Sequence, residues 1–320
     1  MLDFRIHTFI EVCKYMNFTR AAESLSITQP TVSQHIRWLE KEYGTPLFRY
    51  EGKKMFLTEA GQQILSVATT MVHDQEFLRK TVQAAGGRRQ LRLGATLTVG
   101  ETLVADRVKA YLQDHPEDRI LVEVANTRRL TELLDQGKID FALVEGYFEK
   151  KEYDYAVYSL ENYICVCGKP AAERILKGNP GQKRKIRDLL SETLLIREEG
   201  SGTREILEKN LKEKNLGMED FSNYIQINNI SAIKSLVEAG CGITFLYERA
   251  AEKELASGKL RKVELEDFSV RHEFAFIWRK GSVFQEEYRK FFAAAEAGIY
   301  AERENAGEEE ESAGEEGDVR

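Results

Sequence analysis

The sequence predicts an α/β protein that begins with a small all-α winged helix-turn-helix domain and continues as a larger domain of two lobes. Three observations predict this fold class. The first sixty residues show three short helical patterns, a proline-free heptad stripe follows them, and from Leu91 onward strands alternate with helices. At 320 residues the chain is longer than one hydrophobic core usually supports, so several domains are expected.

The composition is that of a soluble globular protein, with 42% apolar and 31% charged residues. No apolar run approaches the roughly 20 residues that span a bilayer, and charged residues interrupt the apolar pattern of the N-terminus, unlike a secretion signal. We therefore expect a cytoplasmic protein without membrane contact. The four cysteines lack zinc-like CxxC spacing and are interpreted as reduced, buried thiols, with thiol sensing as the alternative.

The net charge of −7 would by itself argue against a nucleic-acid partner, but the excess acidic residues are confined to one end of the chain. Residues 301–320 contain nine acidic residues and two arginines, so this segment carries the entire net charge. The rest of the chain is formally neutral. Because the segment has no apolar periodicity, it is predicted to be a disordered acidic tail, whose simplest role is that of a solubilising end.

Residues 1–58 are predicted to form the helix-turn-helix domain. Apolar residues recur at helical spacing in three runs, which are Phe4, Phe9, Ile10 and Cys13, then Ala21, Ala22 and Leu25, then Val32, Ile36, Leu39 and Tyr43. Between the second and third runs, Thr28 is a predicted N-cap, and Pro30 is tolerated only in a first helical turn. Two helices separated by so short a turn are typical of a helix-turn-helix.

The outward face of the third helix is a candidate DNA-recognition surface, because it contains no carboxylate. Gln can bond an adenine edge, Arg a guanine edge or a phosphate, and Ser or Thr the DNA backbone. An ordinary solvated helix face is the alternative interpretation. The residues on or beside this face are Thr28, Gln29, Pro30, Thr31, Ser33, Gln34, Arg37 and Lys41. After Gly44 and Pro46 a two-stranded wing is expected, with phosphate-binding cations at Arg49, Lys53 and Lys54.

The order of residues through this region resembles the N-terminal domain of LysR-type transcription regulators nearly position for position. The matching residues are Phe9, Asn17, Phe18, Thr19, Ala21, Ala22, Leu25, Thr28, Gln29, Pro30, Val32, Ser33, Ile36, Leu39, Glu40, Gly44, Pro46, Leu47, Phe48, Leu57, Thr58, Ala60 and Gly61. The resemblance implies recognition residues between Gln29 and Arg37 and wing cations between Arg49 and Lys54. One departure weakens the expected wing contact, because Tyr50 stands where the family usually has an arginine.

Residues 59–87 are predicted to form a linking helix that dimerises. Spacings of four and three place a heptad stripe at Ile64, Ala68, Met71, Gln75, Leu78 and Val82. A solitary helix laid on its own domain would show a similar stripe, but the resemblance implies a dimer, with Gln75 as the polar residue that fixes register. A homodimer or homotetramer would place a pair of helix-turn-helix domains on two DNA half-sites. Gly86 and Gly87 are expected to end the helix.

Residues 88–300 are predicted to be a parallel α/β domain of two similar lobes. The expected strands are 91–95, 120–124, 139–144, 163–167, 194–196, 225–227 and 243–246, and the expected helices are 101–113, 128–136, 203–214 and 230–239. Ligands of such sheets bind where strands end and helices begin. The resemblance implies paired lobes of the periplasmic-binding-protein type with a small-molecule effector between them.

The loop containing Gly200, Ser201, Gly202 and Thr203 is the leading effector-site candidate, because its glycines admit close approach and its hydroxyls can donate. An ordinary capped turn is the alternative. Other strand ends supply further candidates, which are Thr96, Leu97, Thr98, Asn126, Thr127, Glu145, Asn228 and Asn229. The Gly-Ser-Gly-Thr-Arg string is most similar to regulators of sulfur and carbon assimilation, which implies sulfite, sulfate or a small carboxylate as effector. Inward-facing Glu101, Glu145 or Glu199 would repel such an anion.

An enzyme on the same two-lobed fold is the principal rival hypothesis, but the sequence offers no catalytic set. The five histidines are scattered, and no nucleophile elbow, P-loop or metal-ligand spacing occurs. A pure ligand-binding protein would not need residues 1–60. We therefore expect no enzyme activity, cofactor or metal. The expected partners are double-stranded DNA, a small-molecule effector and a second copy of the chain, with RNA polymerase as a further candidate.

Overall fold

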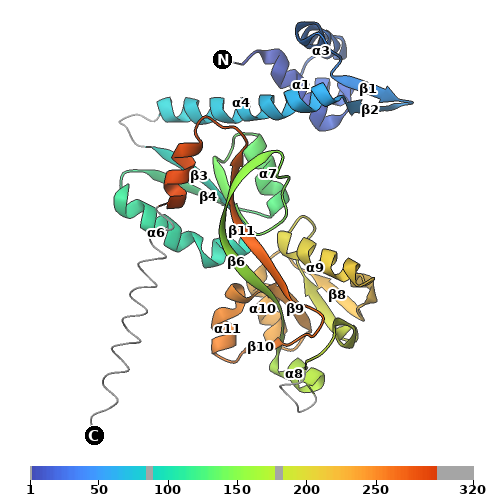
Figure 1. Cartoon of the computed structure of the whole chain (residues 1–320), viewed down its shortest axis with the longest axis vertical. Coiled ribbons are helices and arrows are strands. Elements are labelled where there is room, and N and C mark those ends of the chain that lie inside the picture. Colours follow the sequence, from blue (N-terminus) through green and yellow to red (C-terminus); the bar gives the residue numbers. More distant parts are fainter. Residues whose placement is uncertain (1, 84–88, 177–182, 294–320) are drawn as a thin grey trace.

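The computed structural model describes residues 2–83, 89–176 and 183–293, and it places a long helix between a small N-terminal domain and a two-lobed domain (Figure 1). The predicted acidic tail and the glycine pair at the end of the linking helix lie outside the described residues. In the described part of the chain, no helix is long and apolar enough to cross a bilayer.

The N-terminal domain has the predicted three helices and two-stranded wing. The elements are α1 (Phe4–Tyr15), α2 (Phe18–Leu25), α3 (Gln29–Tyr43), β1 (Phe48–Glu51) and β2 (Lys54–Leu57). Asp3, Asn17 and Thr28 cap the three helices, each accepting a hydrogen bond from a backbone N–H of the first turn. Gly44 ends α3 in the left-handed region at φ 66°, which glycine adopts without steric cost. These local signals explain why the sequence predicted the domain.

Helix α4 (Glu59–Gln83) is the predicted linking helix, but its apolar stripe divides along its length. Ala68 belongs to the core of the N-terminal domain and the partly buried Ile64 packs against it, intrachain contacts that compete with a place in a dimer seam. The Oε1 atom of Gln75 accepts a hydrogen bond from the Leu2 backbone N–H at 2.9 Å, an intrachain contact that competes with a role in fixing dimer register. The exposed apolar residues of α4 are Val67, Met71, Leu78 and Val82.

The opposite face of α4 packs on the two-lobed domain. Phe77 contacts the rings of Phe284 and Tyr288, with centroids 4.6 and 5.4 Å apart. The guanidinium of Arg279, which is buried, donates to the Ser66 backbone carbonyl of the helix at 3.1 Å. Apolar and polar contacts therefore join the linking helix to the domain below it.

The two lobes are formed by separate parts of the chain. The first contains β3 (Gln90–Ala95), α5 (Leu97–Thr102), α6 (Val104–Asp114), β4 (Arg119–Val124), α7 (Thr127–Asp135) and β5 (Phe141–Val144). The second contains α8 (Lys169–Leu176), η2 (Ile186–Leu189), β7 (Thr193–Ile196), α9 (Gly202–Glu213), η3 (Met218–Asp220), β8 (Asn223–Gln226), α10 (Ile230–Glu238), β9 (Ile243–Tyr247), η4 (Glu248–Ala251), α11 (Glu252–Ala256) and β10 (Leu260–Val263).

Two long strands, β6 (Tyr153–Gly168) and β11 (Val270–Arg279), cross between the lobes and pair with each other in antiparallel fashion (Figure 1). The strand order is β4-β3-β5-β11-β6-β9-β7-β8, with β10 paired to β6. The prediction of a parallel sheet therefore holds within each lobe, where β3 pairs with β4 and β5 and β7 pairs with β8 and β9. It is wrong at the crossing, because strands that pass back between lobes must run in opposite directions.

Several predicted boundaries are corrected. The helix expected at 101–113 is two helices, α5 and α6, which meet at Leu103. The strand expected at 163–167 is only the end of β6, and the strand expected at 225–227 is β8, which begins and ends earlier. β11 was not predicted, because its pairing partner lies more than a hundred residues away in sequence.

Candidate DNA-binding surface and effector cleft

The outward face of α3 carries the polar residues that the sequence predicted. Gln34, Arg37 and Lys41 are exposed, as are Gln29 and Pro30. At the start of the helix the Thr28 hydroxyl accepts the Thr31 backbone N–H at 3.3 Å, which fixes the first turn. The amide of the next residue, Gln29, donates to the hydroxyl of Ser33 one turn along the helix, at 2.9 Å. The surface therefore presents amide, hydroxyl and guanidinium groups in the combination that reads base edges.

A shallow groove of about 290 Å³ lies between α3 and the wing. Its lining residues are Phe18, Gln29, Ser33, Ile36, Arg37, Glu40, Phe48 and Tyr50. Glu40 brings one carboxylate to the groove, and its Oε1 accepts the Leu47 backbone N–H at 2.9 Å. Tyr50 is 64% exposed and reaches the same groove, so the residue that departs from the family pattern lies beside the candidate recognition residues.

The three wing cations differ in how available their charge is to a DNA phosphate. Arg49 forms an ion pair with Glu51 on the same strand, and its guanidinium carbon lies 5.1 Å from the centre of the Phe56 ring. Lys53 and Lys54 are exposed and have no ion pair within the described ranges. The two lysines are therefore better placed than Arg49 to contact a DNA phosphate.

Between the lobes, the side chain of Glu145 is the centre of a buried polar cluster. Glu145 follows β5, is 1% exposed, and accepts a hydrogen bond from the Thr203 hydroxyl at 2.8 Å. Its backbone carbonyl accepts the Tyr247 hydroxyl at 2.7 Å. Tyr163, on the crossing strand β6, donates to the Thr203 carbonyl at 2.8 Å. Residues from both lobes and from a crossing strand therefore meet at one point.

Several polar atoms of this cluster have no hydrogen-bond partner within residues 2–83, 89–176 and 183–293. They are Thr96 Oγ1, Thr98 Oγ1, Glu145 Oε2 and Arg197 Nη1. Leaving such an atom buried without a partner costs about 1–3 kcal/mol, so native structures rarely keep several together without a functional reason. The cluster has the hydroxyl and guanidinium donors that an anionic ligand requires.

Burial raises the pKa of the Glu145 carboxyl above its usual value. The Thr98 and Thr203 hydroxyls and the positive charge of Arg197 oppose that shift in the pKa, but burial is the larger effect. A carboxyl that is neutral can donate a hydrogen bond, whereas a carboxylate can only accept one. The protonation state of Glu145 therefore decides whether the cluster attracts or repels an anion.

The lobes touch at two glycines beside this cluster. A Cβ atom built on Gly146 would lie 2.6 Å from the Cα of Gly202 and 2.6 Å from Thr127 Oγ1, so no side chain fits there. Asn126 of the first lobe also donates to Glu198 of the second at 3.3 Å. The cleft is closed in this arrangement, and the glycine contact separates the Glu145 cluster from the space outside it.

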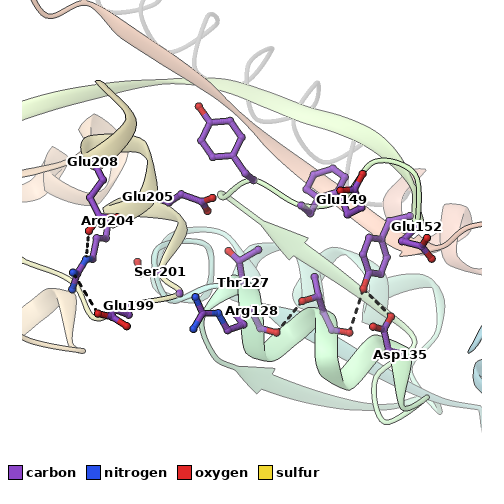
Figure 2. A pocket seen from close by; sticks show the side chains of 15 residues that line it. Thr127, Arg128, Asp135, Glu149, Glu152, Glu199, Ser201, Arg204, Glu205 and Glu208 are labelled. Carbon is purple, nitrogen blue, oxygen red and sulfur yellow. Dashed lines mark hydrogen bonds and ion pairs between the residues drawn. The ribbon is translucent and has the colours of Figure 1, made fainter. Parts of the chain in front are cut away.

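Outside the glycine contact lies an open pocket of about 620 Å³, between α7, α9 and the chain that follows β5 (Figure 2). We call it the outer pocket. Its lining residues are Thr127, Arg128, Thr131, Asp135, Tyr147, Phe148, Glu149, Glu152, Tyr153, Glu199, Gly200, Ser201, Arg204, Glu205 and Glu208.

The predicted effector residues therefore divide into two groups. Thr96, Thr98, Glu145 and Thr203 belong to the buried cluster, whereas Thr127, Gly200 and Ser201 line the outer pocket, with Gly202 at the contact between them. Two predicted residues belong to neither group. Leu97 is half-buried as the first residue of α5, and Asn228 is exposed in the loop that follows β8.

Three residues of the cluster were not predicted from the sequence, namely Tyr163, Arg197 and Tyr247. Arg197 directly follows β7, so the rule that ligands meet strand ends could have identified it. Tyr247 likewise ends β9. Tyr163 lies within β6 and carries no such signal, because its role depends on the crossing of that strand between the lobes.

A helix-turn-helix head joined by a long helix to a two-lobed binding domain defines a ligand-responsive transcription regulator. Residues 5–62 match the family model described as bacterial regulatory helix-turn-helix protein, lysR family, and residues 84–298 match the LysR substrate binding domain. The chain belongs to the LysR family of transcription regulators. It has a DNA-binding domain and an effector-binding domain, and its relatives are regulators rather than enzymes.

Individual relatives agree with this assignment. The chain is 28% identical over 284 residues to the RuBisCO operon transcriptional regulator of Allochromatium vinosum, covering 87% of this chain and 89% of that one. It is 28% identical over 274 residues to the HTH-type transcriptional regulator CysL of Bacillus subtilis, covering 85% and 89%. The CcmR regulatory domain of Synechocystis in complex with 2-PG has the same fold, with a TM-score of 0.58, 18% identity, and coverage of 66% and 97%.

Proposed function

We propose that this regulator reads operator DNA with α3 as a cytoplasmic homodimer or homotetramer, and that a small oxyanion or carboxylate bound in the Glu145 cluster controls it. The observation that carries the DNA proposal is the outward face of α3, where Gln34 and Arg37 are exposed at the centre. A contact with RNA polymerase stays a prediction.

The DNA proposal predicts different losses at different residues. Gln34→Ala and Arg37→Ala are each expected to cost about 1–3 kcal/mol in binding to the preferred duplex, because each removes contacts to base edges. Lys53→Ala is expected to weaken preferred and random duplexes alike and to reduce the salt dependence, because it removes a phosphate contact. Fluorescence anisotropy titrations at several salt concentrations, with a duplex selected by the protein from a random pool, measure both effects. Equal losses on selected and random DNA for Arg37→Ala would refute base reading.

The assignment of an anion to the Glu145 cluster is supported by its unpartnered donors. Thr96, Thr98 and Arg197 are buried donors from both lobes. The two threonine hydroxyls lie close enough to the Glu145 carboxyl to oppose the rise in its pKa that burial causes, and on turning to a ligand that also accepts from Arg197 they would hold the lobes together. The related CcmR domain was solved in complex with 2-PG, which supports ligand binding on this fold. Sulfite, sulfate and small carboxylates are the first candidates, because they present several acceptor oxygens in little volume.

Binding of sulfate is expected to weaken as the pH rises. Below the raised pKa of Glu145 the carboxyl is neutral and donates to the anion, whereas above that pKa the carboxylate repels it. Binding then takes up a proton, so affinity falls by up to about tenfold per pH unit above the pKa. Glu145→Gln keeps a neutral donor and should remove the dependence. Sulfate suits this measurement, because its own charge is constant between mildly acidic and mildly alkaline pH.

Thermal shift and calorimetric titration across that pH range test the proposal. A ligand present at about 100 times its dissociation constant should stabilise the protein by roughly 2.7 kcal/mol. If no oxyanion or small carboxylate shifts the transition at any pH, the proposed effector class is wrong. If sulfate binds with the same pH dependence in Glu145→Gln, Glu145 is not the titrating group.

Two exposed features support self-association. Val67, Met71, Leu78 and Val82 form an apolar stripe on α4. The sheet also ends at two exposed strands, β4 and β8, which carry exposed Leu121, Val122 and Val124 and exposed Tyr224 and Ile225. Exposed apolar edge strands are normally covered, and a second copy of the chain could cover both. The helix stripe would form one interface of a homodimer, and the strand edges a second interface in a homotetramer.

A further inference from the structure

We propose that the outer pocket is a second ligand site, for a linear aliphatic diamine or polyamine, and that its occupancy reaches the linking helix through Arg279. The proposal goes beyond the anion site in the Glu145 cluster. The two compartments are separated by the Gly146–Gly202 contact, where there is no room for even a Cβ atom. The pocket volume of about 620 Å³ is typical of small-molecule sites.

The charge of the outer pocket favours a cation. Its lining includes six carboxylates, those of Asp135, Glu149, Glu152, Glu199, Glu205 and Glu208, against the two arginines Arg128 and Arg204. Arg204 is already paired with Glu208, at 2.6 Å. Behind the lining, Arg279 pairs with Asp135 and Glu152, and Lys209 lies over the Tyr147 ring, so four cations face the six carboxylates. The remaining excess of negative charge would repel an anionic ligand and attract an ammonium group, and this attraction is strengthened where solvent is partly excluded.

The distribution of the carboxylates favours an extended organic cation over a metal ion. Asp135, Glu149 and Glu152 belong to the first lobe and its link to β6, whereas Glu199, Glu205 and Glu208 belong to the second, so the two groups face each other across the pocket (Figure 2). In the described part of the chain, no three acidic, histidine or cysteine side chains converge as metal ligands. A diamine can place one ammonium group against each lobe.

Two further features of the lining suit such a ligand. The Thr127 and Ser201 side chains are 4% and 2% exposed, and neither hydroxyl has a hydrogen-bond partner in the parts of the chain that the structure describes. Hydroxyl oxygens accept from ammonium groups as carboxylates do. The rings of Tyr147, Phe148 and Tyr153 also line the pocket. Lys209 and Arg279 already lie over the Tyr147 and Tyr153 rings, at 4.3 and 5.1 Å from the ring centres, so what the aromatic rings offer the ligand is mainly apolar surface for its methylene chain. The site therefore combines acceptors at its ends with apolar surface between them.

The pocket is connected to α4 by one buried arginine. Arg279, 1% exposed, donates to Asp135 at 2.9 Å and to Glu152 at 3.1 Å, and both carboxylates line the pocket. The same guanidinium donates to the Ser66 carbonyl at 3.1 Å and contacts the Thr70 hydroxyl at 3.4 Å, both on α4. An ammonium group that binds Asp135 or Glu152 competes with Arg279 for that carboxylate. The competition changes the contacts of the guanidinium with Ser66 and Thr70 of α4.

Calorimetric titration of the full chain with putrescine and spermidine tests the site, with 1,4-butanediol as an uncharged probe of similar length. Diamine binding at one site per chain is expected at physiological salt, and the diol should not bind. Glu149→Gln and Glu205→Gln should each weaken binding by about tenfold, because each removes one charge-assisted hydrogen bond. Glu213→Gln, an exposed position on the same helix α9 outside the pocket, is the matched control and should bind like the parent.

The acidic segment 301–320 is common to all these proteins, so weak binding of polyamines to it cancels in the comparison. Absence of diamine binding, or equal binding by the parent and both pocket variants, would overturn the site. Hydrogen exchange tests the connection to α4, because diamine should change amide protection around residues 66–70 in the parent and not in Glu205→Gln. Diamine binding that leaves the protection of this segment unchanged would overturn the relay through Arg279.

Discussion

Asp140→Ala is expected to lower the free energy of unfolding of the effector domain by about 3–5 kcal/mol, because it leaves a buried arginine without its partner. Asp140 and Arg92 form an ion pair in which the side chains are 1% and 6% exposed. The same carboxylate accepts the Arg92 backbone N–H at 2.7 Å, so the substitution also removes a hydrogen bond to the backbone of β3. Chemical denaturation followed by the fluorescence of buried Trp278 measures the loss.

The matched control for Asp140 is Glu132→Ala in the same lobe. Glu132 pairs with Arg129 at 2.9 Å, but both side chains are about half exposed. Exposed pairs typically contribute less than about 1 kcal/mol, so this variant should unfold almost like the parent. Similar losses for the two variants would show that burial does not determine the strength of these pairs.

The linking helix α4 contacts the Asp140 pair. The Asp140 backbone carbonyl lies 3.2 Å from Nε2 of His73, a fully buried residue of α4. Asp74 of the same helix accepts hydrogen bonds from the Ser282 hydroxyl at 2.6 Å and from the Val283 backbone N–H at 2.9 Å. Buried polar contacts therefore hold the linking helix on the effector-binding domain.

Those parts of the fold that depend on local chemistry could be predicted from the sequence. The Thr28 cap, Pro30 in the first turn and Gly44 at the end of α3 each act within a few residues, and all three act as expected. The crossing strands could not be predicted in full, because β11 pairs with residues more than a hundred positions earlier. The burial pattern along β6 also changes, because partly buried and exposed side chains in its first part give way to a continuous run of buried residues in its last part.

The candidate effector site, like the fold, could be predicted only where it depends on residues close together in the sequence. Hydroxyl-bearing loops at strand ends do converge, because parallel strands of one lobe end at the same edge. The outer pocket was not predicted, since its lining comes from three segments near residues 127–135, 147–153 and 199–208. The pocket is acidic because carboxylates from both lobes come together in the folded chain. The sequence places Glu145 at a strand end and raises the question of anion repulsion, but its burial, which raises its pKa, is visible only in the folded chain.

The apolar stripe of α4 predicts the largest functional effect. Met71, Leu78 and Val82 are 52%, 51% and 75% exposed and follow one another at helical spacing along one exposed side of α4. If a second α4 covers them, Leu78→Glu buries an unpaired charge in the interface and should convert the dimer to a monomer. A monomer holds only one half-site, so affinity for a two-half-site operator should fall by about 100- to 10,000-fold.

Sedimentation velocity and DNA titration of Leu78→Glu measure these two effects together. Leu160→Glu on β6 is the matched control, because Leu160 is 56% exposed and the chemical change is identical. The control should remain dimeric and bind the operator like the parent. Leu78→Glu should still bind a single half-site with parental affinity, because α3 is untouched and only the gain from simultaneous engagement is lost. A Leu78→Glu protein that stays dimeric and keeps full operator affinity would place the dimer interface elsewhere, with the exposed edges of β4 and β8 as the next surfaces to disrupt.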